Sequence, residues 1–289
     1  MNAPLETIDI ESSLDDIEFL ARSEHRVNAL VALTEGSYDR RDLQNATGAS
    51  VSTISRVLTD LEDRHWITRN PPRYELTPLG TFVTERFLDL HEAIGLERTL
   101  RDVWQWLPRD MDGFSVELFD DVVVSYPGPA YPYQPVERVT HLLEHTETIR
   151  GLGTTIYKSG NIEVFCRRVI EGMEMEYVYA PSVLRAIIVW NPDLVTDVFA
   201  CENCTILLHD DLPDGDRCGL NVMDDYIGIC GHERETAQLK AVIDTQSPEA
   251  RAWATDVYER YRSEARPFDP NSFETGDQDS RRTALRVEV

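Results

Sequence analysis

The sequence predicts a protein of mixed class, α+β / α/β, with a small helical domain that includes a β-hairpin and then a larger α/β domain. Its 289 residues suggest about two domains, at a prior of ~150 residues each. The first ninety residues follow the order helix, helix, glycine turn, helix, hairpin, helix, whereas strand-like and helix-like patterns alternate beyond about residue 115. We expect a domain over 15–95, a connector over 96–114, a second domain over 115–265 and a disordered tail over 266–289.

The first helices of the N-terminal domain are indicated by apolar periodicity. Leu20, Val27, Leu30 and Val31 fall on one helical face, Ser23 or Glu24 could open a new turn, and Gly36 ends that helix. A short segment over residues 40–47 follows, with Leu43 and Ala46 expected to face inward. Gly48 then supplies a turn, and Ser50 stands where the cap of the next helix belongs.

The helix after Ser50 has two contrasting faces. The inward stripe is expected to comprise Val51, Ile54, Val57, Leu58 and Leu61. The opposite face carries short hydroxyls and one guanidinium, from Ser52, Thr53, Ser55, Arg56 and Thr59. Acidic side chains begin only at Asp60, so this face can approach a nucleic-acid groove without charge repulsion.

A hairpin and a long helix close the domain. The extended segments 66–69 and 73–76 are joined by Asn70-Pro71-Pro72, which places Arg69 and Arg73 near the tip. Thr77 is expected to cap the last helix, with Pro78 at its first position. The predicted core face of that helix consists of Leu79, Val83, Phe87, Leu90 and Ile94.

Four segments of this domain resemble the winged helix-turn-helix domains of archaeal transcription regulators. They are residues 49–58, Leu61-Glu62, Trp66-Ile67 and the closing run Tyr74-x-Leu-Thr-x-x-Gly80. The resemblance covers about residues 15–95. It implies that the helix from Ser50 enters the major groove of double-stranded promoter DNA, while the wing touches the flanking backbone. The DNA-binding residues expected on this basis are Ser50, Ser52, Thr53, Ser55, Arg56, Thr59, Arg69 and Arg73.

The charge distribution indicates an anionic partner and an environment of concentrated salt. Against 28 Lys and Arg stand 52 Asp and Glu, and only Lys158 and Lys240 are lysines. The window 40–73 nevertheless holds six arginines against four acids, a positive island in a chain of net charge −24. In about 1 M salt the Debye length falls to ~3 Å and the acidic self-repulsion is screened. The composition therefore resembles that of haloarchaeal proteins in general, which speaks of habitat rather than function.

The second domain is predicted from alternating patterns. Strands are expected over 116–124, 153–158, 175–180, 205–210 and 239–244, with a hairpin formed by 219–223 and 226–230. Helices are indicated around Val139, Phe165, Ile187 and Trp253. The segments 219–225 and 253–261, in this order of elements, resemble the C-terminal sensor domain of methanogenesis-regulator-type archaeal transcription factors. That resemblance implies a domain that responds to a small molecule or signal and helps the protein dimerise.

Three groups of residues suggest other chemistry. Cys201-x-x-Cys204, with Cys218 and Cys230 downstream, provides four thiols for zinc or a redox pair, although the spacing lacks a second CxxC and core packing is favoured. His141-x-x-Glu144-His145 matches the inverted zinc-peptidase spacing, but its helix shows no third ligand and ordinary surface is favoured. The loop 126–133 is either a ligand wall at a strand end or, slightly favoured, a stiff connector.

The sequence therefore predicts a dimeric, DNA-binding transcription regulator rather than an enzyme, with a possible small-molecule effector and no cofactor. The alternative is a thiol- or metal-dependent sensor or enzyme using Cys201 and Cys204, with the winged helix as a protein contact. No apolar run approaches the ~18–20 residues that span a bilayer, so no membrane partner is expected. The acidic N-terminus lacks a secretory pattern, which favours the cytoplasm.

Overall fold

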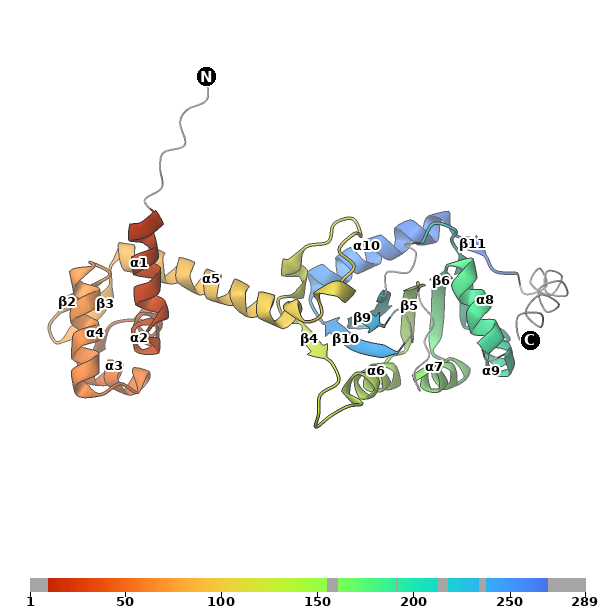
Figure 1. The fold of residues 1–289 in the computed structure, drawn as a ribbon, viewed down its shortest axis with the longest axis horizontal. Coiled ribbons are helices and arrows are strands. Elements are labelled where there is room, and N and C mark those ends of the chain that lie inside the picture. The colour runs from red at the N-terminus through yellow and green to blue at the C-terminus, as the bar shows by residue number, and fades with distance from the viewer. Residues whose placement is uncertain (1–9, 155–160, 191, 213–217, 234–237, 270–289) are drawn as a thin grey trace, which may run out of the picture. The chain divides into compact units, whose positions relative to one another are not determined.

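A computed structural model describes residues 10–154, 161–190, 192–212, 218–233 and 238–269. The chain divides into two compact units, residues 1–97 and 98–289, which are described separately below. The first unit is mainly helical with a small sheet, and the second is an α/β unit (Figure 1). The predicted fold class is confirmed. No helix in the described ranges is both long and apolar enough to cross a membrane.

The described part of the first unit combines five helices with a three-stranded antiparallel sheet of order β1-β3-β2. Its elements are α1 (Ile10–Ala21), α2 (Glu24–Thr34), β1 (Tyr38–Asp39), α3 (Arg40–Thr47), α4 (Val51–Asp63), β2 (Ile67–Asn70), β3 (Arg73–Leu76) and α5 (Pro78–Arg101). The order from α2 onward is the expected one. The apolar run from Leu20 to Val31 spans the end of α1 and most of α2, and α2 begins at Glu24, one of the two residues expected to open a new turn.

Local capping explains where α3 and α4 begin. The Asp39 carboxylate accepts hydrogen bonds from the backbone N–H of Arg41 and of Asp42, at 2.6 and 2.9 Å. Ser50 caps α4 by accepting from the N–H of Thr53 at 3.2 Å. Between the two helices Gly48 has φ +64°, a left-handed conformation that glycine adopts without steric cost. The expected glycine turn and serine cap are confirmed.

The run that ends at Gly80 ties α5 to the hairpin. The Thr77 hydroxyl donates to the carbonyl of His65 at 2.6 Å, and its oxygen accepts from the N–H of Gly80 at 3.0 Å. A Cβ on Gly80 would lie 1.8 Å from the Trp66 carbonyl oxygen. Only glycine allows the first turn of α5 to approach the start of β2 this closely.

Several inward positions predicted for the first unit are wrong. Val51 is 56% exposed because it lies in the first turn of α4, before the buried stripe begins at Ile54. In α3 the buried residue beside Leu43 is Thr47, whereas Ala46 is exposed. On α5, Val83 and Phe87 pack on the core, but three other residues are exposed: Leu79, Leu90 and Ile94. The side of α5 that packs inward instead includes Gly80 and Thr84.

The second unit contains an eight-stranded sheet of order β11-β7-β6-β5-β8-β9-β10-β4 in its described residues. Its strands are β4 (Val123–Ser125), β5 (Thr148–Gly153), β6 (Glu174–Tyr179), β7 (Cys204–Leu208), β8 (Cys218–Met223), β9 (Ile227–His232), β10 (Leu239–Thr245) and β11 (Arg266–Pro267). Its helices are α6 (Gln134–Glu144), α7 (Asn161–Ile170), α8 (Pro181–Trp190), α9 (Pro192–Phe199) and α10 (Pro248–Glu264), with short 3-10 helices at Trp104–Trp106 and Val116–Phe119.

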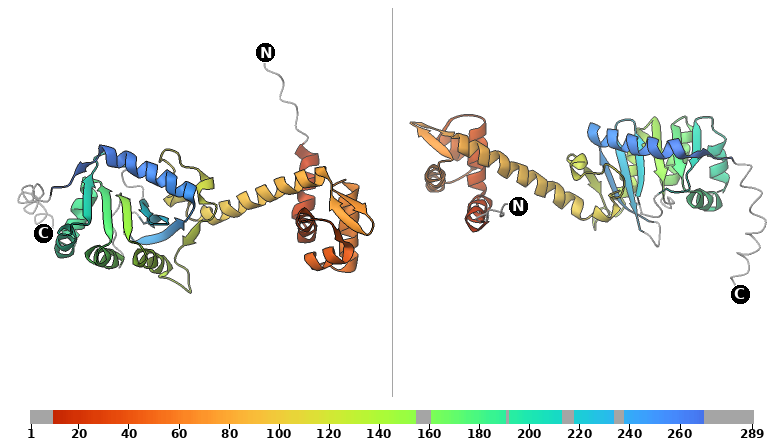
Figure 2. Two further views of the ribbon diagram at one scale, coloured as in Figure 1. Left: turned by 180° about the vertical axis from the view of Figure 1, so that it is seen from behind. Right: turned by 90° about the horizontal axis from the view of Figure 1, so that it is seen from above.

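The sheet changes direction at β5. Strands β5, β6 and β7 run parallel, whereas β8 pairs with β5 antiparallel. Helix α10 covers one face of the sheet, and α6, α7, α8 and α9 cover the other (Figure 2). The main core of this unit lies on the second face, between these four helices and the strands. Helix α6 packs against β10 and β4, and α6 and α7 pack against each other.

Some boundaries predicted for the second unit are wrong. Residues 116–119 form a 3-10 helix, so the strand expected over 116–124 shrinks to β4. A strand was expected over 153–158, but β5 ends at Gly153. Residues 155–160 lie outside the described ranges. Helix α9 was not predicted. The expected tail contains β11, which pairs with β7, and residues 270–289 lie outside the described ranges.

The expected connector, residues 96–114, packs against the second unit. The Phe114 and Trp253 rings meet edge to face, with centroids 6.1 Å apart. The indole N–H of Trp253 donates to the carbonyl of Asp112 at 3.1 Å. Aromatic packing of this kind buries large apolar surface, so the end of the connector acts as part of the second unit rather than as a linker.

Candidate nucleic-acid interface and sensor pocket

The outward face of α4 gathers the hydroxyl residues that the sequence singled out. Ser52 and Thr59 are exposed, while Thr53 and Ser55 are half-buried. The Ser55 hydroxyl donates to the carbonyl of Val51 at 2.9 Å, and the Thr59 hydroxyl donates to that of Ser55 at 3.1 Å. Their hydrogens are therefore directed to the helix backbone, and the oxygen lone pairs remain available as acceptors.

Arg56 lies exposed within this hydroxyl-rich face. Its guanidinium makes no hydrogen bond or ion pair with any residue that the structure describes. The side chain of Arg40, at the start of α3, reaches the same face and lies 3.5 Å from the Ser55 hydroxyl. Arg40 was not among the site residues predicted from the sequence, because it precedes α4 by a whole helix.

The two hairpin arginines have different surroundings. Arg69 is exposed on β2, with its guanidinium 5.6 Å from the centre of the Tyr74 ring. Arg73 donates to the carbonyl of Ser37 at 2.6 Å, which fastens β3 to the segment before β1. Arg64, also part of the positive window, pairs with Asp16 at 3.0 Å and stacks on Phe19. Arg73 and Arg64 thus hold the fold together, whereas Arg69 remains on the surface.

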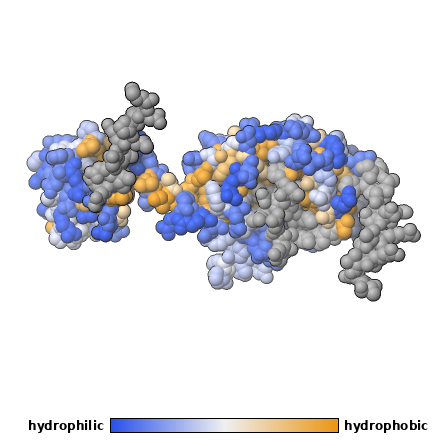
Figure 3. Space-filling view, turned by 45° about the horizontal axis from the view of Figure 1, so that its top comes forward, coloured by the Kyte–Doolittle hydropathy of each residue, from blue (hydrophilic) through white to orange (hydrophobic). Residues whose placement is uncertain are grey.

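Helix α5 presents large apolar side chains to solvent (Figure 3). The exposed fractions are 51% for Leu79, 59% for Phe82, 45% for Leu90 and 50% for Ile94. At 100° per residue these four positions fall within one stripe of the helix. An exposed arginine, Arg86, lies among these positions, with its guanidinium over the Phe82 ring. Large apolar side chains gathered on one exposed side of a helix are typical of a protein–protein contact.

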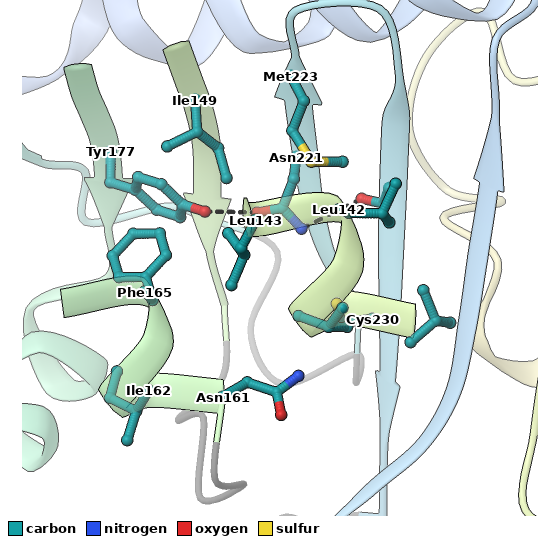
Figure 4. Close-up of a pocket in the computed structure, with 13 residues that line it drawn as sticks. Leu142, Leu143, Ile149, Asn161, Ile162, Phe165, Tyr177, Asn221, Met223 and Cys230 are labelled. Atoms are coloured by element: carbon teal, nitrogen blue, oxygen red, sulfur yellow. Dashed lines mark hydrogen bonds between the residues drawn. The ribbon is translucent and has the colours of Figure 1, made fainter. Parts of the chain in front are cut away.

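A cavity of about 40 Å³ lies between helices α6 and α7 and the sheet (Figure 4). Its lining is mostly aliphatic and aromatic, and includes Leu142, Leu143, Ile149, Ile162, Phe165 and Met223. The Tyr177 hydroxyl donates to Oδ1 of Asn221 at 2.6 Å within this cavity. The Asn221 amide nitrogen donates in turn to the carbonyl of Gly228 at 3.1 Å.

Two glycines of β5 lie against the tyrosine rings beside this cavity. Gly151 lies opposite both Tyr177 and Asn221 in the sheet register. A Cβ on Gly151 would lie 2.6 Å from the Tyr177 ring, and one on Gly153 would lie 2.1 Å from the Tyr179 ring. The Tyr177 and Tyr179 rings stack with centroids 5.4 Å apart. Glycine at these positions lets the tyrosine rings lie over the neighbouring strand.

A polar cluster lies on the other face of the sheet, beneath α10. The Arg262 guanidinium donates to the Glu176 carboxylate at 2.7 Å, and the Tyr258 hydroxyl donates to the same oxygen at 2.8 Å. Burial alone would raise the pKa of Glu176, but these hydrogen bonds and the charge of Arg262 hold it below its usual range. The cluster fixes α10 to β6.

The cysteines do not form an activated pair. Burial, and secondarily the proximity of Cys201 and Cys166, raises the pKa of the Cys204 thiol to about 12. Burial raises the pKa of Cys166 to about 11. Such thiols are protonated at neutral pH and are poor nucleophiles. Cys230 lines the cavity instead of joining the CxxC; Cys218 begins β8, but its side chain lies outside the described residues.

The remaining candidates are surface features. The His141 and His145 rings lie 4.5 Å apart, but Glu144 pairs with Arg167 of α7 at 3.4 Å. Within the described ranges, no group of three or more His, Cys, Asp or Glu could hold a metal ion.

The aromatic loop over residues 126–133 lies on the surface. Tyr126 is 50% exposed, and Tyr131 and Tyr133 are each 70% exposed. These tyrosines do not line the cavity.

Two family models match segments of the chain, one in each unit for most of its length. Residues 14–99 match the family model of the HVO_A0261 N-terminal domain. Residues 132–264 match that of the middle domain of the methanogenesis regulatory protein FilR1. The second match confirms the resemblance of the C-terminal domain to methanogenesis regulators. The α/β unit is thus similar to a domain found in a regulatory protein, and the particular domain it resembles is the middle domain of FilR1.

Individual relatives are distant. The methanogenesis regulatory protein FilR1 of Methanothrix harundinacea (strain 6Ac) is 23% identical over 177 residues. That alignment covers 58% of this chain and only 38% of the relative, so the chain spans less than half of the relative's length.

Among solved structures, TrmBL2, described as an archaeal chromatin protein with a novel mode of DNA binding, is 13% identical with a TM-score of 0.39. That alignment covers 87% of this chain and 98% of TrmBL2. The phospholipase D family member Nuc from Salmonella typhimurium is 9% identical with a TM-score of 0.40, over 51% of this chain and 97% of Nuc. Likenesses at these TM-scores do not identify a function.

Proposed function

We propose that this chain is a DNA-binding transcription regulator whose helix α4 enters the major groove of promoter DNA. The observation that carries the proposal is the outward face of α4, where hydroxyls surround the exposed Arg56 and the first carboxylate along the helix is Asp60. A recognition helix reads bases with its N-terminal residues, which here are hydroxyl-bearing. The match of residues 132–264 to a regulator family supports the same class.

Each candidate residue has a distinct role in this proposal. Arg56 would donate to a guanine edge or a phosphate, and Arg40 and Arg69 would contact the backbone beside it. The hydroxyls of the α4 face would make close, uncharged contacts: Ser50, Ser52, Thr53, Ser55 and Thr59. Arg73 would act indirectly, because its bond to Ser37 positions the hairpin.

The test compares two arginine variants of the full chain on a DNA fragment selected from a random double-stranded library. Arg56→Ala should weaken binding by about 5- to 150-fold, the range of one specific base contact. Arg167→Ala removes the same charge from exposed α7 and should leave affinity within twofold of wild type. Equal affinities of wild type and Arg56→Ala, measured by fluorescence anisotropy, would contradict the proposal.

We infer that the protein is a homodimer joined through the exposed stripe of α5. Burial of Leu79, Phe82, Leu90 and Ile94 against a second copy would remove this apolar surface from water. Two copies related by a twofold axis would present two α4 helices to an inverted repeat. Leu90→Glu with Ile94→Glu should give monomers in light scattering, whereas Val189→Glu, at a still more exposed apolar site on α8, should not.

The second unit is proposed to be the sensor. Its cavity lies between helices α6 and α7 and the sheet and is lined mostly by apolar side chains, with Tyr177, Asn161 and Asn221 as polar groups, a lining typical of small-molecule sites. The alternative, a thiol- or metal-dependent activity at Cys201 and Cys204, is disfavoured because the raised pKa of Cys204 keeps its thiol protonated.

A regulator of promoters acts where the chromosome is, so we also infer a cytoplasmic location. The net charge of −24 further suggests function in concentrated salt. In that case the melting temperature should rise as KCl increases from low to molar concentrations, because screening weakens the acidic self-repulsion. A melting temperature that does not change or falls would contradict the salt adaptation without affecting the DNA-binding proposal.

A further inference from the structure

Helix α4 carries an exposed apolar side chain at the end that is proposed to enter the major groove. Val51, the first residue of the helix, is 56% exposed. A single exposed valine is ordinary on a protein surface, so its significance depends on its neighbours. Ser55 follows it by four residues, and such positions are adjacent on a helix, with Cβ atoms about 5–6 Å apart. Val51 therefore borders the hydroxyl-rich face of α4.

The Ser55 hydroxyl is oriented by Val51 itself. It donates its only hydrogen to the Val51 carbonyl at 2.9 Å, so its oxygen can only accept from any other partner. The Arg40 guanidinium, 3.5 Å away, faces one of the two lone pairs of this oxygen. The other lone pair accepts no hydrogen bond from the residues that the structure describes. Ser55 thus presents a fixed acceptor beside an apolar group.

The Val51 side chain is stiff as well. Because valine is branched at Cβ, about nine in ten valines in helices share one χ1 rotamer. A partner that covers the two methyl groups therefore costs this side chain little conformational entropy. Val51 and Ser55 together form a preorganised pair, one apolar contact and one acceptor.

One kind of base pair matches this pair of groups in the major groove. An A·T pair presents the N6 amino group of adenine, which donates, and the C5 methyl group of thymine, which is apolar. In a G·C pair the amino group of cytosine has no methyl group beside it, and O6 and N7 of guanine are acceptors, as Ser55 is. The Val51 and Ser55 side chains therefore complement A·T, whereas Arg56 complements guanine.

We propose that Val51 and Ser55 read an A·T pair of the bound DNA. Val51 packs on the thymine C5 methyl group, and the Ser55 oxygen accepts a hydrogen bond from the adenine N6 amino group. The inference rests on the proposed function and adds the base pair that the first two turns of α4 select. It makes Val51 a specificity-determining residue, although its spacing in the sequence predicts a core position.

The first test removes one methyl group from the DNA. The full chain is measured by fluorescence anisotropy on the fragment selected from the random library, with each thymine replaced in turn by deoxyuridine, which lacks only the C5 methyl group. At the contacted thymine this replacement should weaken wild-type binding about fourfold, the value of one buried methyl group. The loss should be less than about twofold in Val51→Ala. Val31→Ala, which shortens an exposed valine of α2, should keep the fourfold loss.

The second test removes the amino group of the adenine paired with that thymine. Purine deoxyriboside in place of this adenine should weaken wild-type binding about fivefold, the value of one neutral hydrogen bond. The loss should be less than about twofold in Ser55→Ala. Any weakening of the base pair itself acts on both proteins, so the difference between them measures the contact.

The inference is overturned if no deoxyuridine replacement weakens wild-type binding, or if the losses in Val51→Ala and Ser55→Ala equal those of the wild type. Each of these results leaves the DNA-binding proposal standing when Arg56→Ala still weakens binding to the unmodified fragment. A wild-type chain that selects no sequence from the library overturns both conclusions.

Discussion

The Tyr177 hydroxyl donates a 2.6 Å hydrogen bond to Oδ1 of Asn221, and both residues lie opposite Gly151 of strand β5. Tyr177 belongs to a strand parallel to β5, and Asn221 belongs to an antiparallel one. The bond therefore passes over β5, the strand that pairs parallel with β6 on one side and antiparallel with β8 on the other. The absence of a side chain at Gly151 allows it, since a Cβ there would lie 2.6 Å from the Tyr177 ring.

Removal of this bond should destabilise the second unit without emptying its core. Tyr177→Phe deletes only the hydroxyl and takes the donor away from buried Asn221, which should cost about 1–2 kcal/mol of unfolding free energy. Tyr131→Phe deletes the same group from a side chain that is 70% exposed and should have no measurable effect. Urea unfolding measures both, and equal midpoints for the two variants would contradict this role.

The two ends of α5 should respond oppositely to the same substitution. Gly80→Ala places a Cβ against the Trp66 carbonyl and should destabilise the first unit by about 2–3 kcal/mol. Gly95→Ala, where no atom lies within 4 Å of the added Cβ, should stabilise the helix by about 0.5–1 kcal/mol. Thermal unfolding checks both signs. A Gly80→Ala protein as stable as wild type would show that the close approach to Trp66 is not required.

A buried ion pair fastens α6 to the sheet. Both carboxylate oxygens of Asp244 accept from Arg138, and Asp244 has no exposed surface. Arg138→Leu leaves that charge buried and unpaired, so it should cost about 3–5 kcal/mol. Adding Asp244→Leu should recover much of the loss, because the double variant buries no charge. Arg22→Ala, which breaks an exposed pair with Glu18, should cost less than about 1 kcal/mol.

Acid should destabilise the second unit through His232. Burial lowers the pKa of this histidine from 6.5 to about 4, although a bond to the Cys230 carbonyl opposes the shift. Between pH 4 and pH 6.5 the histidine is protonated in the unfolded chain but neutral in the folded protein. The free energy of unfolding therefore falls as the pH drops from 6.5 to 4. The contribution of His232 to this loss should be roughly 3 kcal/mol. His232→Leu should lose correspondingly less stability over that range, and parallel profiles would contradict the assignment.

Much of the first unit could be predicted because its determinants are local. Gly48 and Ser50 set the turn and the cap, and the Ile54-to-Leu61 stripe sets the buried face of α4. The faces of α5 were harder to predict, since Leu79, Leu90 and Ile94 match a helical core pattern equally well whether they pack inward or face solvent. Periodicity identifies an apolar face but not what covers it.

The cavity could not be predicted, because its parts come from distant segments joined only by strand register. Tyr177, Asn221 and Asn161 belong to β6, β8 and α7, and only Asn221 lies in a segment that the sequence analysis singles out. One local feature could have indicated the site. Two glycines spaced by one residue in a strand, Gly151 and Gly153, leave a sheet face without side chains, onto which neighbouring rings can lie.

The central claim is that the chain is a dimeric regulator of specific promoters, and the most direct test is chromatin immunoprecipitation with sequencing in the organism that encodes it. The account predicts discrete peaks at promoters that share an inverted repeat, and loss of those peaks in Arg56→Ala at equal protein level. An absence of enriched sites with well-expressed protein, or peaks unchanged in Arg56→Ala, would contradict it.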